Sequence, residues 1–365
     1  MRIESVEFHT VHVAPHVDWT FAQVHTDDGL SGLGELNPSV RRSGRLPLAR
    51  EMAGSLVGRD PRRVRQLVES FRPAELDAAG VRALSGLEQA LWDLLAKSLQ
   101  APVHALLGGA CRQEIHVYAN INRATRGDRS PEAFARHAAA AVRGGHDAVK
   151  LAPFDHLPSA LDSAGAGREG IECLRAVRDA VGPEVGVLVD CHSRFTTKGA
   201  LEVAEALGDL HLFWFEEPLP QDDYDGYRQV QAGCRMPVAG GESRALRRGW
   251  WEVLERRALD VAMPDVTIVG GISELHQVAA MAAARGIPTS PHGPFGPVVT
   301  AASAQVMAAH PEFLILEYAW GEAPWREVLI QPAERVVGGR LSVADAPGLG
   351  VELDMGVVDA HRLRD

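Results

Sequence analysis

The stretch Val187-Leu188-Val189-Asp190 has two counterparts further along the chain, Phe213-Trp214-Phe215-Glu216 and Val238-Ala239-Gly240-Gly241-Glu242. Each is an apolar run that ends in a carboxylate, and the three carboxylates follow one another at intervals of 26 residues, at positions 190, 216 and 242. A period of about 25 residues accommodates one strand and one helix of a (β/α) barrel, in which the C-terminal strand ends converge on one mouth. The repeat therefore predicts three acidic side chains at the mouth of a barrel.

Oxygen ligands on neighbouring strand ends form a site for a hard divalent cation. We expect this cation to be Mg²⁺, with one ion per subunit bound by Asp190, Glu216 and Glu242. The alternative is that the three are solvated acids at the starts of loops. In that case their equal spacing and their common position after an apolar run would be a coincidence.

An alternation of strand and helix patterns extends over residues 113–325, which we expect to form the barrel domain. Eight strands, enough to close a barrel, are predicted near residues 115–121, 147–152, 185–190, 211–216, 236–241, 259–264, 286–291 and 313–318. Helical patterns fall between them, for example at 131–144, 171–181, 198–207, 244–256, 272–285 and 297–309. The fold class is therefore α/β.

Residues 1–112 have a different pattern, typical of an α+β domain. Residues 2–13 and 19–26 alternate apolar and polar side chains, as half-buried strands do. Asp27-Asp28-Gly29 then predicts a hairpin turn, and residues 47–107 have helical spacing. The glycines at 29, 32 and 34 lack the strand–loop–helix context of a nucleotide-binding loop, which favours the hairpin.

Residues 326–365 contain short strand patterns and turns rich in Pro and Gly. No further pair of helix and strand follows Tyr318. We therefore expect this third segment to pack back on the first domain.

Composition excludes several classes of partner. The chain has 365 residues, 46% apolar and 23% charged, as an ordinary water-soluble protein has. Its net charge of −11 argues against nucleic acid and anionic membranes as partners. We found neither a signal-peptide core nor an apolar run of 18 residues. The four cysteines form no C-x-x-C pair and are interpreted as reduced thiols of a cytoplasmic protein.

Ionisable side chains occupy the predicted C-terminal ends of seven consecutive strands. In chain order they are Lys150, Asp190 with His192, Glu216, Glu242, Asp265, His292 and Glu317. Gathering so many such groups at one mouth is costly unless they act together. Taken singly, four of them have a simpler explanation: Lys150 could be a solvated strand-end lysine and His192 a loop histidine with its hydrogen bonds satisfied. Asp265 could cap a helix, and Glu317 could pair with Arg326.

Two segments resemble the signatures of a known family. Ala83–Gly108, with Glu88-Gln89-Ala90-Leu91-Trp92-Asp93 and Pro102-Val103-His104-Ala105-Leu106-Leu107-Gly108-Gly109, is similar to the first signature of the mandelate racemase-like branch of the enolase superfamily. The segment from Val189-Asp190-Cys191-His192 to Phe215-Glu216-Glu217-Pro218 is similar to the second. The chain resembles most closely the acid-sugar dehydratases of the galactonate dehydratase type, over nearly its whole length.

The resemblance implies a (β/α)₇β barrel, a modified TIM barrel, under an α+β capping domain formed by the N-terminal segment and the C-terminal tail. It also implies that Asp190, Glu216 and Glu242 bind Mg²⁺, and that a proton is removed beside a carboxylate. Removal of that proton gives an ene-diolate, which a divalent cation stabilises most when its charge is greatest.

The same resemblance implies catalytic roles at the mouth. His292 would be the base, and Asp265, one β/α unit earlier, would hold its other ring nitrogen. Lys150 would add positive charge beside the ene-diolate. Glu317, if protonated in a dry site, would donate a hydrogen bond to it.

His192 distinguishes between reaction types. It shares strand parity with Asp190, so both are expected to point into the mouth while Cys191 points away. Dehydratases of this kind use such a histidine as the general acid that protonates the departing β-hydroxyl. Racemases of the branch tend to have a second lysine two residues after the first, where this chain has Ala152.

We therefore expect a hydro-lyase that converts an aldonate-type acid sugar to a 2-keto-3-deoxy acid. One alternative is an epimerase, racemase or cycloisomerase that acts on a hydroxy acid through the same ene-diolate, with Lys150 and His292 on opposite faces. Another is a sugar-acid sensor without turnover. Relatives are commonly oligomeric, and a homo-oligomer is expected here.

Substrate specificity is expected from loops of the first domain near 14–21 and 37–48, where related proteins have a lid. These loops contain Trp19 and Arg45, together with Phe21, Arg41 and Arg42. Clustered arginines suit a polyhydroxylated or doubly acidic substrate, although a solvated basic loop is the alternative. Arg194 and Trp320 are further candidates for the wall of the site.

Overall fold

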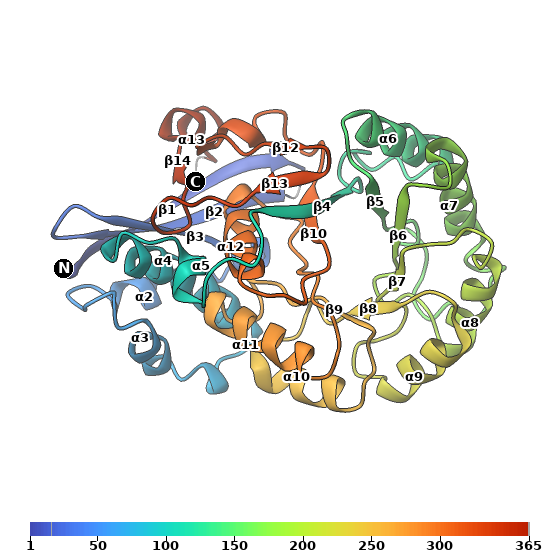
Figure 1. Ribbon diagram of the computed structural model, residues 1–365, viewed down its shortest axis with the longest axis horizontal. Helices are drawn as coiled ribbons and strands as arrows, with labels where there is room; N and C mark the ends of the chain where they lie inside the picture. Colours follow the sequence, from blue (N-terminus) through green and yellow to red (C-terminus); the bar gives the residue numbers. More distant parts are fainter. Residues whose placement is uncertain (16, 364–365) are drawn as a thin grey trace.

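Parallel strands form a closed ring in the computed structural model, which describes residues 1–15 and 17–363 (Figure 1). Its strands are β4 (Glu114–Asn120), β5 (Ala148–Leu151), β6 (Gly186–Asp190), β7 (Trp214–Glu216), β8 (Val238–Gly240), β9 (Val261–Ala262) and β10 (Leu316–Ala319). Each strand from β4 to β8 pairs with the next, and β10 pairs with β4. The barrel predicted from the sequence is confirmed.

The strand predicted near 286–291 is present only as single bridges. Thr289 bridges Ala262 on one side and Phe313 on the other, so it fills the gap between β9 and β10. Pro288 and Pro291 flank it. Because proline has no N–H to donate, a regular ladder cannot extend through these positions.

Helices surround the ring on its outside (Figure 1). They are α6 (Pro131–Arg143), α7 (Arg168–Val181), α8 (Thr197–Ala206), α9 (Tyr224–Gly233), α10 (Leu246–Glu255), α11 (Ile272–Ala283) and α12 (Pro297–Ala308). Local sequence sets their starts. At α6, for example, the Ser130 side chain accepts from the N–H of Ala133, and Pro131 occupies the first turn.

Strand parity divides the ring interior into an apolar layer and a polar layer. Side chains two residues before the mouth form one apolar cluster inside the ring, for example Leu188 and Trp214. The next inward position on the same strands is Asp190 or Glu216. Because successive side chains of a strand alternate between its faces, the acids stand directly above the apolar layer, where water is excluded from below.

The capping part begins with an antiparallel sheet of β1 (Ile3–Ala14), β2 (Val17–Thr26) and β3 (Ser31–Leu36). Helices follow: α1 (Pro38–Arg42), α2 (Leu46–Gly54), α3 (Val64–Ser70), the 3₁₀ turn η1 (Pro73–Glu75), α4 (Ala78–Ser98) and α5 (Val103–Leu106). The hairpin predicted at Asp27-Asp28-Gly29 is confirmed, and Gly29 has φ +86°. Gly34 lets β3 lie against α4, because a Cβ there would be 2.0 Å from the carbonyl oxygen of Gly86.

The last segment contains η2 (Arg326–Val328), β11 (Ile330–Gln331), β12 (Val336–Val337), β13 (Arg340–Ser342), β14 (Glu352–Leu353) and α13 (Met355–His361). It contacts the first sheet, as expected: the N–H of Leu363 donates to the carbonyl of Thr10 at 2.9 Å. It also contacts the barrel, which the sequence did not reveal, because β13 pairs antiparallel with β4 through Leu341 and Ile115. The domain boundaries at 112 and 325 stay predictions.

Two buried glutamates of the capping part hold the N-termini of two barrel helices. Glu88 on α4 accepts from the N–H groups of Ile272 and Ser273, at 2.6 and 2.9 Å. Glu35 on β3 accepts from the N–H of Gly296 at 2.7 Å, and also from that of Val299. These N–H groups have no partner within their own helices, so the two glutamates attach the capping part to the barrel.

A change in the pH dependence of stability is expected for Glu35→Gln. Burial raises the pKa of Glu35 to about 8, against a lowering by the N–H groups of Gly296 and Val299. The folded state therefore binds more protons than the unfolded state between about pH 4.5 and 8, and this group's contribution to stability falls as pH rises through that window. Glutamine does not titrate, so the thermal midpoint of the variant should fall less than that of the unaltered protein when the pH is raised from about 4.5 to 8. Each kcal/mol of difference in the free energy of unfolding corresponds to roughly 2–4 °C.

The control for this prediction is Glu69→Gln on the exposed face of α3. The slopes of midpoint against pH are compared, because glutamine also loses one acceptor and changes the midpoint at every pH. An unchanged slope in Glu35→Gln would contradict the prediction.

Within residues 1–15 and 17–363, no helix is both long enough and apolar enough to span a membrane.

Candidate active site

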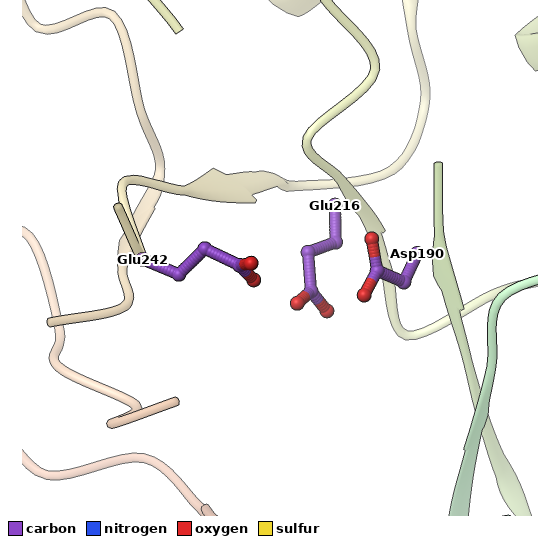
Figure 2. Close-up of side chains that lie close together, drawn as sticks. All are labelled: Asp190, Glu216 and Glu242. Carbon is purple, nitrogen blue, oxygen red and sulfur yellow. The ribbon is translucent and has the colours of Figure 1, made fainter. Parts of the chain in front are cut away.

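The three predicted carboxylates meet at the mouth of the ring. Figure 2 shows the side chains of Asp190, Glu216 and Glu242 pointing toward a common space. One oxygen from each lies within 4.8 Å of the other two. Asp190 and Glu216 end β6 and β7, whereas Glu242 follows β8 after Gly241, which has φ +99°. A Cβ at Gly241 would lie 2.5 Å from the ring of Trp250, so this turn requires glycine.

The electrostatics of this cluster suit a divalent cation. Burial raises the pKa of Glu216 well above its usual value, and the charge of Asp190 raises it further. Burial also raises the pKa of Glu242. Oε2 of Glu242 is buried and has no hydrogen-bond partner among the described residues. Buried like charges are costly unless a cation compensates them, and an all-oxygen set is what Mg²⁺ prefers.

Lys150 lies beneath the cluster. Its Nζ is 2.7 Å from Oε1 of Glu216 and 2.7 Å from Oε1 of Glu317, and it is fully buried. Burial lowers the pKa of Lys150, but the charges of Glu216 and Glu317 more than offset this, so the pKa lies well above its usual value. Lys150 is therefore a fixed positive charge that holds two carboxylates. It does not line the cavity that opens at the mouth of the ring.

Glu317 does not meet the condition on which it would donate, a protonated carboxyl group. Burial would raise the pKa of Glu317, but the positive charges of Lys150 and His292 lower it below its usual value. Its two oxygens accept from Asn120 Nδ2 at 2.7 Å and from the N–H of Gly293 at 2.9 Å. As an anion it has no proton to donate to a substrate.

His292 and Asp265 form the expected pair. Nδ1 of His292 donates to Oδ2 of Asp265 at 2.6 Å, and their backbones bridge as neighbours in the ring. Nε2 faces the other acids, 3.4 Å from Glu242 Oε2 and 3.7 Å from Glu317 Oε2. Burial lowers the pKa of His292, but the carboxylates of Glu242 and Glu317 raise it to about 10.

His192 also faces the mouth, but not for the expected reason. Strand β6 ends at Asp190, and His192 has φ +42°, so strand parity does not apply to it. Its Nδ1 donates to Oδ1 of Asp155, and its Nε2 lies 3.0 Å from Oδ2 of Asp190. The charge of Asp190 raises the pKa of His192 to about 12. The carboxylates of Asp190 and Asp155 therefore favour the protonated imidazole.

A cavity of about 270 Å³ opens above these groups. Its wall includes Asp190, Glu242, His192 and His292, and therefore both candidate histidines. The rest of the wall is Arg42, Asn120, Asn122, Arg123, Arg129, Asp155, Pro294, Phe295, Ala319, Trp320 and Glu322. Trp320 is where the sequence placed it.

Three predicted binding residues lie elsewhere. Trp19 is within β2, fully buried, with its ring 5.6 Å from that of Trp325. Arg45 pairs on the surface with Asp77 at 2.9 Å. Arg194 donates to the carbonyl of Asp155 at 3.0 Å and does not line the cavity. The described residues near 14–21 belong mostly to the sheet. From the second predicted loop, near 37–48, Arg42 lines the cavity, and it is the last residue of α1.

Several wall residues were missed in the sequence. Asp155 lies in an irregular segment after β5, past the strand end where candidates were sought. Arg123 follows β4 and pairs with Glu322 at 2.8 Å. The signal that could have revealed them is charge in the loops after the first, second and last strands, because loops at this end of a barrel form its active site.

Comparison with known proteins identifies the family. The family model described as mandelate racemase / muconate lactonizing enzyme, N-terminal domain, matches residues 4–108. The model described as enolase C-terminal domain-like matches residues 133–357. Among solved structures, a mandelate racemase/muconate lactonizing enzyme-like protein from Rubrobacter xylanophilus superposes with a TM-score of 0.91 at 33% identity, covering 100% of this chain and 98% of its own.

Three curated relatives are similar over nearly the full length. D-xylonate dehydratase of Haloferax volcanii is 33% identical and covers 98% of this chain and 89% of its own. D-galactonate dehydratase of Variovorax paradoxus is 34% identical, with coverage of 95% and 91%. D-galactarolactone cycloisomerase of Agrobacterium fabrum is 30% identical, with coverage of 94% and 91%. The chain is therefore a member of the mandelate racemase/muconate lactonizing enzyme family of the enolase superfamily.

Proposed function

We propose that this protein is a Mg²⁺-dependent hydro-lyase that dehydrates an aldonate-type acid sugar to a 2-keto-3-deoxy acid. The observation that carries the proposal is that one cavity contains two histidines, His192 and His292, each held by its own aspartate. A reaction that removes a proton and expels water needs one base and one acid, and this arrangement supplies both. The dehydratase names of two relatives support the same reaction.

His292 acts as the base. Because Asp265 accepts the proton of Nδ1, the nitrogen that faces the cavity is Nε2. A cation bound at Glu242 would offset the carboxylate charge that raises the pKa of His292, so Nε2 would carry a lone pair in the loaded site. Nε2 takes the proton from carbon 2, next to the substrate carboxylate. Asp190, Glu216 and Glu242 would hold Mg²⁺, whose positive charge would lower the energy of the resulting dianion.

His192 acts as the acid. The bond between carbon 3 and its hydroxyl oxygen breaks, its electrons stay with the oxygen, and His192 gives that oxygen a proton to release water. The enol that remains takes up a proton at carbon 3 and becomes the 2-keto acid. Asp155 keeps the His192 ring oriented for this transfer through Nδ1.

Lys150 argues against the two-base alternative. A racemase or epimerase needs a second base opposite His292, and Lys150 is protonated and lies beneath Glu216 and Glu317. Cycloisomerisation needs only one base and a ring oxygen as leaving group, and one relative is named for it. It is therefore the second candidate function.

Incubation with a panel of acid sugars tests the proposal. The panel contains aldonates, aldarates and aldarolactones with Mg²⁺, and semicarbazide detects 2-keto acids. We expect keto-acid formation from at least one aldonate and none after chelation of the metal. Conversion of a lactone without keto acid would favour the cycloisomerase, and the absence of both products would reject both functions.

A loss of substrate affinity is expected for Arg42→Gln. Arg42 lines the cavity and has no ion-pair partner among the described residues, so its charge is available to the far end of the substrate. Removal of one charge-assisted hydrogen bond costs about 1.5–3 kcal/mol, and we expect KM to rise by about 10-fold or more while kcat changes less. The control is Arg45→Gln, since Arg45 pairs with Asp77 away from the cavity. Equal effects of the two variants would contradict a binding role for Arg42.

A further inference from the structure

Two buried residues connect the capping part to the pair of Asp265 and His292. Nδ2 of Asn37, just before α1, donates to Oγ1 of Thr267 at 2.9 Å. Oγ1 of Thr267 donates in turn to Oδ1 of Asp265 at 2.6 Å, and the N–H of Thr267 donates to the same oxygen at 2.6 Å. Asn37, Thr267 and Asp265 are all buried, so water does not compete for these contacts.

The direction of every proton in this chain of contacts is fixed. Oδ1 of Asn37 accepts from the N–H of Ser39 at 3.0 Å, and an N–H can only donate, so the NH₂ group of Asn37 must be the end that faces Thr267. The hydroxyl of Thr267 thus receives one proton and must direct its own proton to the carboxylate of Asp265, which only accepts.

This arrangement determines how Asp265 meets His292. Two donors occupy Oδ1 of Asp265, which leaves Oδ2 for Nδ1 of His292. A threonine hydroxyl rotates freely unless a second partner fixes it. Without the amide of Asn37, the hydroxyl can turn away from Asp265. Oδ1 then keeps one of its two donors, the N–H of Thr267, so the carboxylate is held less firmly and can tilt the ring of His292.

Asn37 also has a second role, because its Oδ1 caps the N-terminus of α1. The last residue of α1 is Arg42, which lines the cavity. The same amide group therefore contacts α1, which carries Arg42, and the hydroxyl of Thr267, which orients Asp265 and through it His292.

We propose that Asn37, acting through Thr267, is a positioning residue that couples the alignment of His292 to the placement of α1 beside the cavity. The proposal rests on the role of His292 as the base in the proposed function. Asn37 belongs to the capping part and lies 230 positions before Thr267 in sequence, yet it would contribute to the chemistry of the barrel.

The test compares Asn37→Ser, Thr267→Val and Thr267→Ser. Serine at 37 keeps a helix-capping oxygen but has no amide to donate, and valine at 267 keeps the shape of threonine without its hydroxyl. We expect Asn37→Ser and Thr267→Val each to lower kcat by about 10-fold or more, with KM little changed. Thr267→Ser should retain kcat, and the double variant Asn37→Ser/Thr267→Val should lose no more than Thr267→Val alone. Additive losses, or a full loss in Thr267→Ser, would overturn the proposal.

A spectroscopic measurement keeps this test separate from the proposed function. The proton on Nδ1 of His292, hydrogen-bonded to a buried carboxylate, gives a downfield NMR signal that His292→Asn identifies by its absence. We expect Asn37→Ser and Thr267→Val to shift or broaden this signal and Thr267→Ser to keep it. An unchanged signal in the first two variants rejects the positioning role, even if the enzyme turns over. If no acid sugar reacts while the signal responds as expected, the proposed function fails and the coupling stands.

Discussion

His292→Asn is expected to abolish exchange of the substrate's α-proton, with a loss of about 10²–10⁴-fold, the range that a general base contributes. Asparagine can still donate to Asp265 in place of Nδ1, so the buried carboxylate keeps a partner. What disappears is the basic Nε2 at the mouth. Exchange is measured by NMR in D₂O with an acid sugar that the unaltered protein dehydrates.

Two controls accompany this variant. The affinity for Mg²⁺, measured by calorimetry, should change little, because His292 is not one of the three carboxylates of the cluster. His211→Asn, on the exposed surface away from the cavity, should exchange at the normal rate. If His292→Asn still exchanges the α-proton at near the normal rate, another residue is the base and the proposed mechanism is wrong.

His192→Asn is expected to separate the two halves of the reaction. Keto-acid formation should fall by about 10²–10⁴-fold, because no acid remains to protonate the departing hydroxyl. Proton removal by His292 should continue, so substrate recovered from D₂O should contain deuterium at carbon 2. Both products are followed in one NMR sample over time.

Asparagine is chosen here because of the backbone. His192 has φ +42°, a left-handed conformation that asparagine tolerates better than most residues. His211 has φ +48°, so His211→Asn is a control matched in both residue type and conformation. Equal loss of exchange and dehydration in His192→Asn would mean that His192 supports the site as a whole and is not a separate acid.

The sequence predicted the barrel and the acid cluster because both follow from strand geometry. Apolar runs of one period place their ends at one mouth, and parity points Asp190 and Glu216 inward above Leu188 and Trp214. The pair of Asp265 and His292 followed from the same spacing of one β/α unit. These features depend on regular structure, which local sequence determines well.

The cavity wall was predicted less well because it consists of loops. Asp155 and Glu322 lie beyond strand ends, in segments whose path depends on contacts made far away in sequence. Trp19 and Arg45 were assigned to a lid, but Trp19 is in β2, and among the described residues of that region only Arg42 lines the cavity. The charge of Glu317 could not be predicted either, because it depends on Lys150, a partner 167 positions away.

The position of β4 has a consequence for how the chain acquires its structure during synthesis on the ribosome. Besides β5, strand β4 pairs with β10 and β13, and both of these are synthesised late. β10 follows β4 by about 200 residues, and β13 comes later still. Until they emerge, the nascent chain exposes an unpaired edge of parallel strands, which is prone to association with other chains. We therefore expect chaperones that protect such edges to raise the yield of this enzyme, and truncations before residue 342 to aggregate.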